Sequence, residues 1–343
     1  MTIIYFILVL GITVSIHEFG HFICAKKSKV HVYEFSIGMG PLIKKWTRKN
    51  DETQYSIRLF PIGGYVSMAG EDTDEYDDDK IPDDKKLMNK PWKNKFMTVV
   101  AGIVMNFILA IFVFFIVGLV AGVPSNKAYI SEIQEDSPAY TSGLKENDEI
   151  LKVNGKNINS DMLLLKLAIN DEKPVRFTVR HEDNTLDNII VTPEKTDEGY
   201  KFGFGIGTNI KRGFFKSIKY AFTKFISLIV QMIYIVSYLV VGKLKLNNLS
   251  GPVGIFNIVG EAGRAGFINV IYLIGYLSLN VGFVNLLPIP AFDGGRLLFL
   301  IIEKIKGSSV NPKVENFIHT LGFAFLLVLM VVITYNDIIR IIR

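Results

Sequence analysis

The sequence of 343 residues contains one cysteine, Cys24, and no arginine-rich tract. A single cysteine cannot form an internal disulfide bond or build a cysteine-based zinc site. Without a basic tract, the net charge of +5 does not indicate nucleic-acid binding. Hydrophobic residues make up 49% of the chain, and the mean hydropathy is positive. We therefore expect a multi-span membrane protein and exclude an ordinary soluble enzyme.

The N-terminus also lacks the marks of a cleaved signal peptide. No lysine or arginine precedes the apolar run that begins at Met1, and no small-residue cleavage site follows it. About sixteen residues pass without a charge before His17, which is typical of a membrane helix. We expect this run to be kept as the first span.

The first apolar run contains the sequence His17-Glu18-Phe19-Gly20-His21. In a helix, the imidazoles of a His-Glu-x-x-His sequence lie one turn apart on one face, at the spacing that binds a zinc ion. Glu18 is then placed to take a proton from a water molecule that the metal activates. Chance can produce this spacing on an exposed helix, but a charged group at the centre of a membrane helix costs roughly 2.5 to 3.5 kcal/mol. The motif therefore predicts a metal site.

Four segments are expected to cross the membrane. Lysines follow the first span and precede the second, so the positive-inside rule places the loop between them in the cytoplasm. Since a helix rises about 1.5 Å per residue, His17 then lies in the cytoplasmic half of the bilayer. The four spans are roughly Ile3 to Ala25, Phe96 to Ala121, Ile268 to Leu287 and Phe317 to Tyr335.

A fifth apolar segment, residues 225–241, poses the main topological question. Polar or amphipathic residues recur here every three or four positions, which favours an amphipathic helix in the membrane interface. If this segment crossed the membrane, the next span would carry Asp293 to the face opposite His21. We therefore predict that the segment does not cross and that the protein has four spans.

The connecting segments differ in composition. Residues 31–69 are rich in glycine and β-forming residues, which predicts short strands joined by tight turns. Residues 71–86 are dominated by Asp, Glu and Lys, which is typical of a solvated loop. The linker 243–266 contains glycine and proline and is expected to have irregular backbone at the membrane surface.

Residues 122–210 form a different kind of sequence, with alternating apolar residues, turn signals and no span. Ser137-Pro138-Ala139 is followed by Gly-Leu-Lys-Glu-Asn-Asp-Glu-Ile-Leu-Lys-Val-Asn-Gly at 143–155, and this pattern resembles a PDZ domain. A PDZ domain binds an extended peptide by strand addition. The glycine-rich residues 202–206 are either the strand and loop that contact such a peptide or a plain terminal strand. We expect this domain outside the cytoplasm.

A catalytic zinc ion usually has three protein ligands, so a third ligand is expected from elsewhere in the chain. The best candidate is Asp293, which follows Pro288 and Pro290 and precedes two glycines. The prolines break the helix, and the glycines free the backbone where the carboxylate must turn toward a metal. An Asp-Gly pair alone is also a common turn signal.

Together these features resemble the site-2 protease family, in the branch of the RseP/RasP type that regulates bacterial sigma factors. The resemblance rests on His-Glu-x-x-His in the first span, the PDZ pattern after the second, and Asn-x-x-Pro-x-Pro-x-x-Asp-Gly from Asn285 in the third. It extends to the Gly-Gly-Tyr-Val sequence at 63–66 and to residues 245–252. Only one PDZ domain is evident, whereas some members of the family have two.

The resemblance implies a zinc endopeptidase that cuts substrates within the membrane. By this likeness His17, His21 and Asp293 bind Zn²⁺, and Glu18 activates the water. Residues 55–69 would form a membrane re-entrant β-hairpin that pairs with the substrate strand. The residues expected to bind substrate are Asn285, Pro288, Gly63, Gly64 and Tyr65.

The likeness also implies partners and a location. We expect single-span membrane substrates, such as trimmed anti-sigma factors or remnant signal peptides, and peptide or ectodomain contacts through the PDZ domain. The location would be the bacterial cytoplasmic membrane, with no nucleic-acid partner. The expected segments are 1–30 (first span), 31–95 (cytoplasmic β-hairpin-rich loop), 96–121 (second span), 122–210 (PDZ domain), 211–267 (interfacial helix and linker), 268–303 (third span) and 304–343 (fourth span and tail).

Two other functions remain open from the sequence. Histidine and aspartate within a membrane also mark ion pathways, so a metal transporter is an alternative. The other is a non-catalytic PDZ scaffold with an inactive metal site.

Among smaller features, Asn106 in the second span is expected to bond to a neighbouring helix or to face substrate. His31, His181 and His319 lack partners at ligand spacing and are expected to be structural or exposed.

Overall fold

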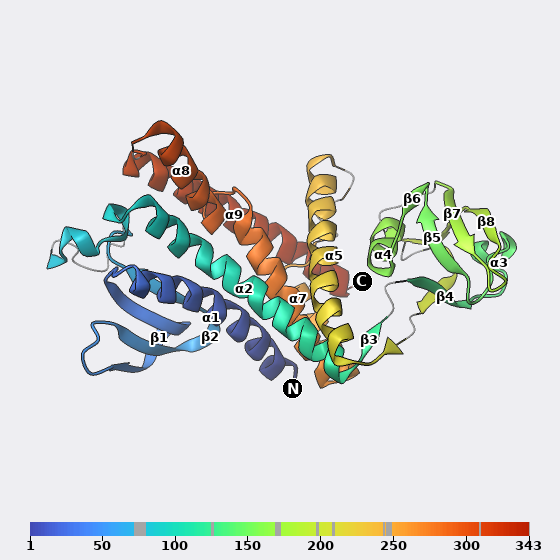
Figure 1. The fold of residues 1–343 in the computed structure, drawn as a ribbon, viewed down its shortest axis with the longest axis horizontal. Coiled ribbons are helices and arrows are strands. Elements are labelled where there is room, and N and C mark those ends of the chain that lie inside the picture. Colours follow the sequence, from blue (N-terminus) through green and yellow to red (C-terminus); the bar gives the residue numbers. More distant parts are fainter. Residues whose placement is uncertain are drawn as a thin grey trace. The chain divides into compact units, whose positions relative to one another are not determined.

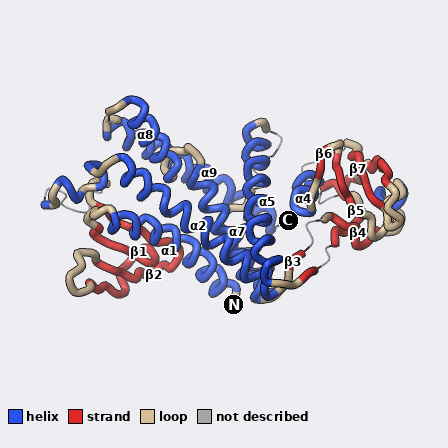
Figure 2. Tube along the Cα trace, in the orientation of Figure 1, coloured by secondary structure: helices blue, strands red, loops and turns tan. Residues whose placement is uncertain are grey.

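The computed structural model describes residues 1–71, 80–124, 127–168, 173–196, 199–207, 210–242, 244, 249–308 and 310–342. The chain divides into two compact units. The first unit comprises Met1–Phe114 and Leu246–Arg343, and the second comprises Phe115–Lys245. Figure 1 labels their helices and strands, and Figure 2 separates helix from strand along the chain.

The first unit consists mainly of helices. Within it, α1 packs against α6 and α7, and α6 packs against α7 and α9. The helix α2 begins in this unit and ends in the second. The helices are α1 (Thr2–Lys27), α2 (Trp92–Val120), α6 (Pro252–Ala265), α7 (Phe267–Leu286), α8 (Asp293–Lys306) and α9 (Pro312–Ile342).

Several of these helices have the length and composition of membrane spans. Within the described residues, α1, α2, α5 (Phe214–Val240), α7 and α9 are long and apolar enough to cross a bilayer. The multi-span character expected from the sequence is therefore confirmed. Because α5 meets the same criteria as the others, the four-span topology with an interfacial α5 stays a prediction.

A sheet formed by β1 (Val32–Thr47) and β2 (Gln54–Met68) packs against α1. Both strands are long and irregular, and Val32–Ile37 pairs with two segments of β2, one near Tyr55 and the other from Gly64 to Met68. The apolar residues Ala25, Val30, Val32, Met68 and Leu87 form the core between this sheet and the end of α1. The predicted strands are therefore present, and they lie beside the helix that carries His17 and His21.

The acidic loop lies partly outside the described residues, because its residues 72–79 are not described. The remainder contains two short 3₁₀ turns, η2 (Asp83–Lys85) and η3 (Leu87–Asn89). Of the segment 245–252 that carries part of the family resemblance, residues 245–248 are likewise outside the described residues.

The prediction of irregular backbone for the linker is wrong over Pro252–Ala265, which forms the helix α6. Pro252 is at the start of this helix, where its missing N–H is not needed. Two backbone N–H groups at this end, from Gly251 and Gly254, donate to Asp337 of α9 at 2.9 and 2.7 Å. At Gly263, a side chain would come within 2.7 Å of the Tyr5 ring. Glycine and proline here allow close helix packing and helix initiation, which composition alone does not distinguish from a loop.

A break separates α7 from α8. The helix α7 ends at Leu286, directly before Pro288 and Pro290, and α8 begins at Asp293. A Cβ atom on Gly294 would lie 2.0 Å from the carbonyl oxygen of Leu287. The glycine is therefore needed for the close return of the chain, which places Asp293 at the first turn of α8.

The second unit contains an antiparallel sheet in the order β11-β4-β5-β7-β8, with β6 paired to β5. Its core is apolar and includes Ile130, Ile150 and Phe177. The elements are β3 (Val123–Pro124), β4 (Ala128–Ile133), α3 (Pro138–Thr141), β5 (Glu149–Val153), β6 (Lys156–Asn157), α4 (Ser160–Ala168), β7 (Val175–Arg180), β8 (Leu186–Val191), β9 (Glu194–Thr196), β10 (Gly199–Lys201), β11 (Phe204–Gly207), β12 (Ile210–Lys211) and α5.

Candidate metal centre

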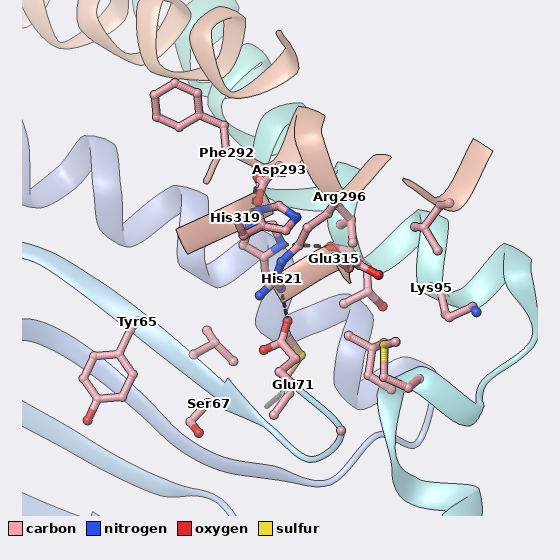
Figure 3. Close-up of a pocket in the computed structure, with 18 of the residues that line it drawn as sticks. His21, Tyr65, Ser67, Glu71, Lys95, Phe292, Asp293, Arg296, Glu315 and His319 are labelled. Atoms are coloured by element: carbon pink, nitrogen blue, oxygen red, sulfur yellow. Dashed lines mark hydrogen bonds and ion pairs between the residues drawn. The ribbon is translucent and has the colours of Figure 1, made fainter. Parts of the chain in front are cut away.

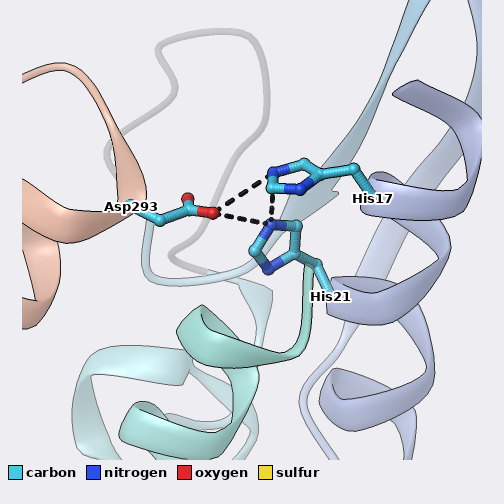
Figure 4. Close-up of side chains that lie close together, drawn as sticks. All are labelled: His17, His21 and Asp293. Atoms are coloured by element: carbon cyan, nitrogen blue, oxygen red, sulfur yellow. Dashed lines mark hydrogen bonds and ion pairs between the residues drawn. The ribbon is translucent and has the colours of Figure 1, made fainter. Parts of the chain in front are cut away.

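Three side chains from two distant parts of the sequence meet beside α1. His17 and His21 lie one turn apart on α1, and Asp293 reaches them from the start of α8 (Figure 4). The Nε2 atoms of the two histidines are 3.2 Å apart. The Oδ2 atom of Asp293 is 3.2 Å from Nε2 of His17 and 3.3 Å from Nε2 of His21.

These three distances fit a single zinc ion. Zinc binds nitrogen and oxygen ligands at about 2.0 to 2.1 Å in tetrahedral geometry, which separates any two ligand atoms by about 3.3 Å. Among the described residues, the buried Oδ2 atom of Asp293 has no hydrogen-bond partner. A cation at the common point would satisfy this oxygen, so the donor set suits the metal.

The outer contact of His21 sets which ring nitrogen faces the centre. Its Nδ1 atom lies 2.8 Å from the carbonyl oxygen of Thr98 on α2. Because a carbonyl can only accept, the ring proton is on Nδ1 and the lone pair of Nε2 points toward Asp293. His21 is thus arranged as a metal ligand before any ion binds.

The helix α2 closes the back of the centre. Thr98, Gly102 and Asn106 are spaced four residues apart, so they lie along one face. A Cβ atom on Gly102 would lie 2.3 Å from Nε2 of His21 and 2.8 Å from Cε1 of His17. Only glycine leaves room for both imidazoles at this position.

A pocket of about 930 Å³ opens onto the three side chains (Figure 3). Glu18 lines it, together with Tyr65, Ser67 and Glu71 from the end of β2 and beyond. Gly64 lies next to Glu18, because a Cβ atom there would be 3.6 Å from Cγ of Glu18. The pocket therefore joins the histidine pair, the candidate base and one segment of the sheet.

The residues expected to bind substrate are distributed unevenly around the centre. The amide nitrogen of Asn285 lies 3.4 Å from Nε2 of His17. Tyr65 lines the pocket, and Gly64 lies next to Glu18. Gly63 lies beside Met39, since a Cβ atom on Gly63 would be 3.0 Å from the Met39 side chain. Pro288 lies in the break between α7 and α8. Of the five residues expected to bind substrate, only Tyr65 is among the described residues that line the pocket.

Several residues at this site were not expected from the sequence. Thr98 acts through its backbone carbonyl, which any residue type supplies, so no sequence signal could reveal it. Gly102 could not be identified either, because a glycine in an apolar helix gives no sign of the side chains opposite it. Arg296, on the rim, forms an ion pair with Glu71.

Two smaller expectations can be compared with the structure. Nδ1 of His319 accepts a hydrogen bond from the backbone N–H of Ala291 at 2.9 Å, which is a structural contact in the helix break. The side chain of Asn106 contacts His17 and, through Ser278, the neighbouring helix α7. Interhelical bonding by Asn106, one of the two expected roles, is therefore confirmed.

Comparison with known proteins agrees with this geometry. The model of peptidase family M50 matches residues 5–329. The regulator of sigma-W protease RasP of Bacillus subtilis is 33% identical, with 99% of this chain and 98% of that protein covered. The zinc metalloproteases RasP of Bacillus licheniformis and Oceanobacillus iheyensis are 32% and 31% identical, each with 99% of both chains covered. The chain therefore belongs to peptidase family M50, the site-2 proteases, and is a membrane zinc metalloendopeptidase.

Proposed function

We propose that His17, His21 and Asp293 hold the catalytic zinc ion and that Glu18 is the general base for peptide-bond hydrolysis within the membrane. The observation that carries this proposal is the convergence of three ligand atoms at separations of 3.2 to 3.3 Å. Two of them come from an apolar helix. Ionisable groups are costly in such a helix, so those that occur there usually serve a function.

The chemistry divides between the metal and the chain. Zinc, when bound, makes a water molecule acidic and polarises the scissile carbonyl. Glu18 takes the proton from that water and passes it to the leaving nitrogen. The amide of Asn285, which lies beside His17, is placed to donate a hydrogen bond to a substrate carbonyl in the pocket.

The sheet beside the pocket supports a route for presenting substrate. A substrate helix keeps its carbonyls in internal hydrogen bonds, so it must unwind before one can react. In the pairing of the described residues, Gly64–Met68 is an outer segment of the sheet, and Tyr65 to Met68 line the pocket. An outer strand offers backbone donors and acceptors to an extended chain. We propose that unwound substrate pairs with this segment.

The substrates we propose are single-span membrane proteins. The relative in Bacillus subtilis is named a regulator of sigma-W protease, which supports anti-sigma factors already trimmed outside the cell as one class. Remnant signal peptides are another class with a single apolar helix. The location that fits these substrates is the bacterial cytoplasmic membrane, with the active site in its cytoplasmic half.

Residues 122–210 are proposed to be an extracytoplasmic PDZ domain. Support comes from the Ser-Pro-Ala and Val-Asn-Gly sequences and from the position of β11 at one end of the sheet order among the described strands. Strand β11 contains Phe204-Gly205-Ile206-Gly207 and would be free to add a peptide strand or contact an ectodomain. This assignment favours peptide contact over a plain terminal strand.

The alternatives are less well supported. A metal transporter requires ionisable groups distributed along a path, but His17, His21 and Asp293 gather at one level. A non-catalytic scaffold has no need for Glu18 in the same pocket as His17, His21 and Asp293.

The test is cleavage of a model single-span substrate by purified protein in lipid. We expect Glu18→Gln to lower the rate by about 100- to 10,000-fold, the range for loss of a general base, and zinc chelation to abolish cleavage reversibly. Retained zinc content in Glu18→Gln serves as the control for folding. Equal product from wild type and Glu18→Gln would exclude the proposed mechanism.

A further inference from the structure

One fully buried polar side chain near the metal centre has no role in the mechanism above. Asn106 is 0% exposed and lies on α2 between α1 and α7. Its amide nitrogen lies 3.3 Å from Nδ1 of His17. On the other side, the hydroxyl of Ser278 donates to the backbone carbonyl of Asn106 at 3.0 Å and contacts its side-chain oxygen at 3.2 Å.

The role of His17 determines what this contact must be. For Nε2 of His17 to bind a metal beside Asp293, that nitrogen needs its lone pair, so the ring proton must be on Nδ1. A buried N–H needs an acceptor. Among the described residues, the side chain within hydrogen-bond distance of this nitrogen is that of Asn106.

The amide of Asn106 can meet this need when it turns over, which exchanges its nitrogen, now beside His17, with its oxygen, now beside Ser278; the two atoms are similar in size and fill nearly the same space. With its oxygen toward His17 it accepts the Nδ1 proton, and its NH₂ group faces the oxygen of Ser278. The hydroxyl proton of Ser278 still goes to the backbone carbonyl of Asn106, so the Nδ1 proton of His17, the amide oxygen and the Ser278 hydroxyl each have a partner. With its nitrogen toward His17, the amide would instead force the ring proton onto Nε2, where it blocks metal binding.

We propose that Asn106, oriented by Ser278, accepts the Nδ1 proton of His17 and thereby holds His17 as an Nε2 ligand. Asn106 is a positioning residue that acts through His17, as the carbonyl of Thr98 acts through His21. The inference rests on the proposed metal centre. Unlike the carbonyl of Thr98, the side chain of Asn106 can be changed by mutation.

The experiment measures zinc binding by the full-length protein in detergent or nanodiscs, by competition with a chelator. We expect Asn106→Leu to weaken zinc affinity by about 10- to 100-fold, the range for loss of an outer contact to a ligand. Asn106→Asp, which can only accept, should keep affinity close to wild type. Ser278→Ala should cause a smaller loss, because the amide is then free to turn.

A spectroscopic signature separates positioning from a general structural role. In the Co²⁺ form, the exchangeable Nδ1 protons of His17 and His21 give hyperfine-shifted proton resonances. We expect two such signals in wild type and in Asn106→Asp. In Asn106→Leu, the signal of His17 should broaden or exchange rapidly, whereas that of His21 stays.

Asn280 offers a matched control on α7. It is half-buried, and its NH₂ group donates to the carbonyl of Tyr276 in its own helix at 2.9 Å. Asn280→Leu and Asn280→Asp repeat both substitutions away from His17, so they should change neither zinc affinity nor the Co²⁺ signals. In particular, Asn280→Asp tests whether any added carboxylate raises affinity for a cation.

The outcomes are distinguishable. If wild type does not bind zinc, the proposed metal centre itself fails. If wild type binds zinc and Asn106→Leu binds as tightly, with both signals kept, the role of Asn106 is disproved. Folded Asn106→Asp that behaves like Asn106→Leu would show that a donor is required, which also overturns the inference. If Asn106→Leu does not fold, Asn106→Asp and Ser278→Ala decide the question.

Discussion

The two units bury polar groups for different purposes. In the second unit, the buried Asp148 accepts from the backbone N–H of Lys145, three residues away, and so stabilises a local turn. It also pairs with His181, 33 residues later in the sequence. In the first unit, the buried groups His17, His21 and Asn106 form contacts between helices far apart in the sequence. Ionisable side chains that converge on one another within apolar helices therefore mark the functional site, whereas buried carboxylates that accept from backbone N–H groups, such as Asp148 and Asp337, stabilise a turn or a helix start.

The largest expected effect comes from removing the space that α2 leaves for the imidazoles. Gly102→Ala would place a methyl group within 2.3 Å of Nε2 of His21. We expect zinc binding to fall sharply and cleavage to drop by about 100-fold or more, since small displacements of reacting groups have effects of this size. Zinc affinity and the cleavage rate are the measurements.

Gly118 provides the control on the same helix. A Cβ atom there would meet side-chain atoms of Tyr220 and Ser217 at 3.1 and 3.2 Å, which can shift slightly. Gly118→Ala should leave zinc affinity unchanged. A Gly102→Ala protein with normal zinc affinity would mean that α2 does not constrain the histidines, and the comparison between the units would lose its main support.

The next prediction changes the core of the second unit and leaves the metal centre intact. Phe177 is 0% exposed in the apolar core of the second unit. Phe177→Ala should destabilise that unit by about 3 to 5 kcal/mol, the usual cost of such a cavity. Limited proteolysis of the full chain should show earlier cleavage within 122–210, while zinc affinity stays at the wild-type level. Loss of zinc binding in this variant would contradict the view that the centre is built by the first unit alone.

The smallest effect concerns a polar cluster at the surface of the β1-β2 sheet. Burial raises the pKa of Asp51, but hydrogen bonds from Lys26, Thr53 and Tyr55 outweigh it and hold the pKa well below its usual range. Because the folded-state pKa is lowered, the stabilisation is complete above the ordinary carboxyl value of about 3.9. It is lost as the pH falls below that value toward the folded-state pKa.

Asp51→Asn should therefore remove this part of the acid dependence of stability. The effect should stay below about 1 kcal/mol, since ion pairs near solvent contribute little. Unfolding of wild type and Asp51→Asn, measured from about pH 3 to about pH 6, checks this expectation, because this range runs from about one unit below the ordinary carboxyl pKa to about two units above it. Parallel pH profiles for the two proteins would count against a stabilising role, and zinc binding at pH 7 should be unaffected in either case.

Much of the metal centre could be predicted from the sequence because its chemistry depends on side chains at fixed spacing. The His-Glu-x-x-His sequence defines one face of one helix, and the prolines before Asp293 mark a helix break where a carboxylate can turn. Gly102 was not predicted, because a glycine in an apolar helix gives no sign of what lies opposite it. The linker helix α6 was mistaken for irregular backbone for a related reason, since Gly263 is explained by the ring of Tyr5.

Residue identity and spacing alone define the chemical groups available to this protein. They are two imidazoles, a carboxylate base and one acidic metal ligand, all within or beside apolar segments. Helix packing, in contrast, places Asp293 3.2 Å from His17 and lets α2 supply the outer contacts of His17 and His21. The reason is that residue spacing specifies neighbours within one helix, whereas distances between helices depend on how their surfaces pack. A backbone carbonyl such as that of Thr98 acquires a specific role only through this packing.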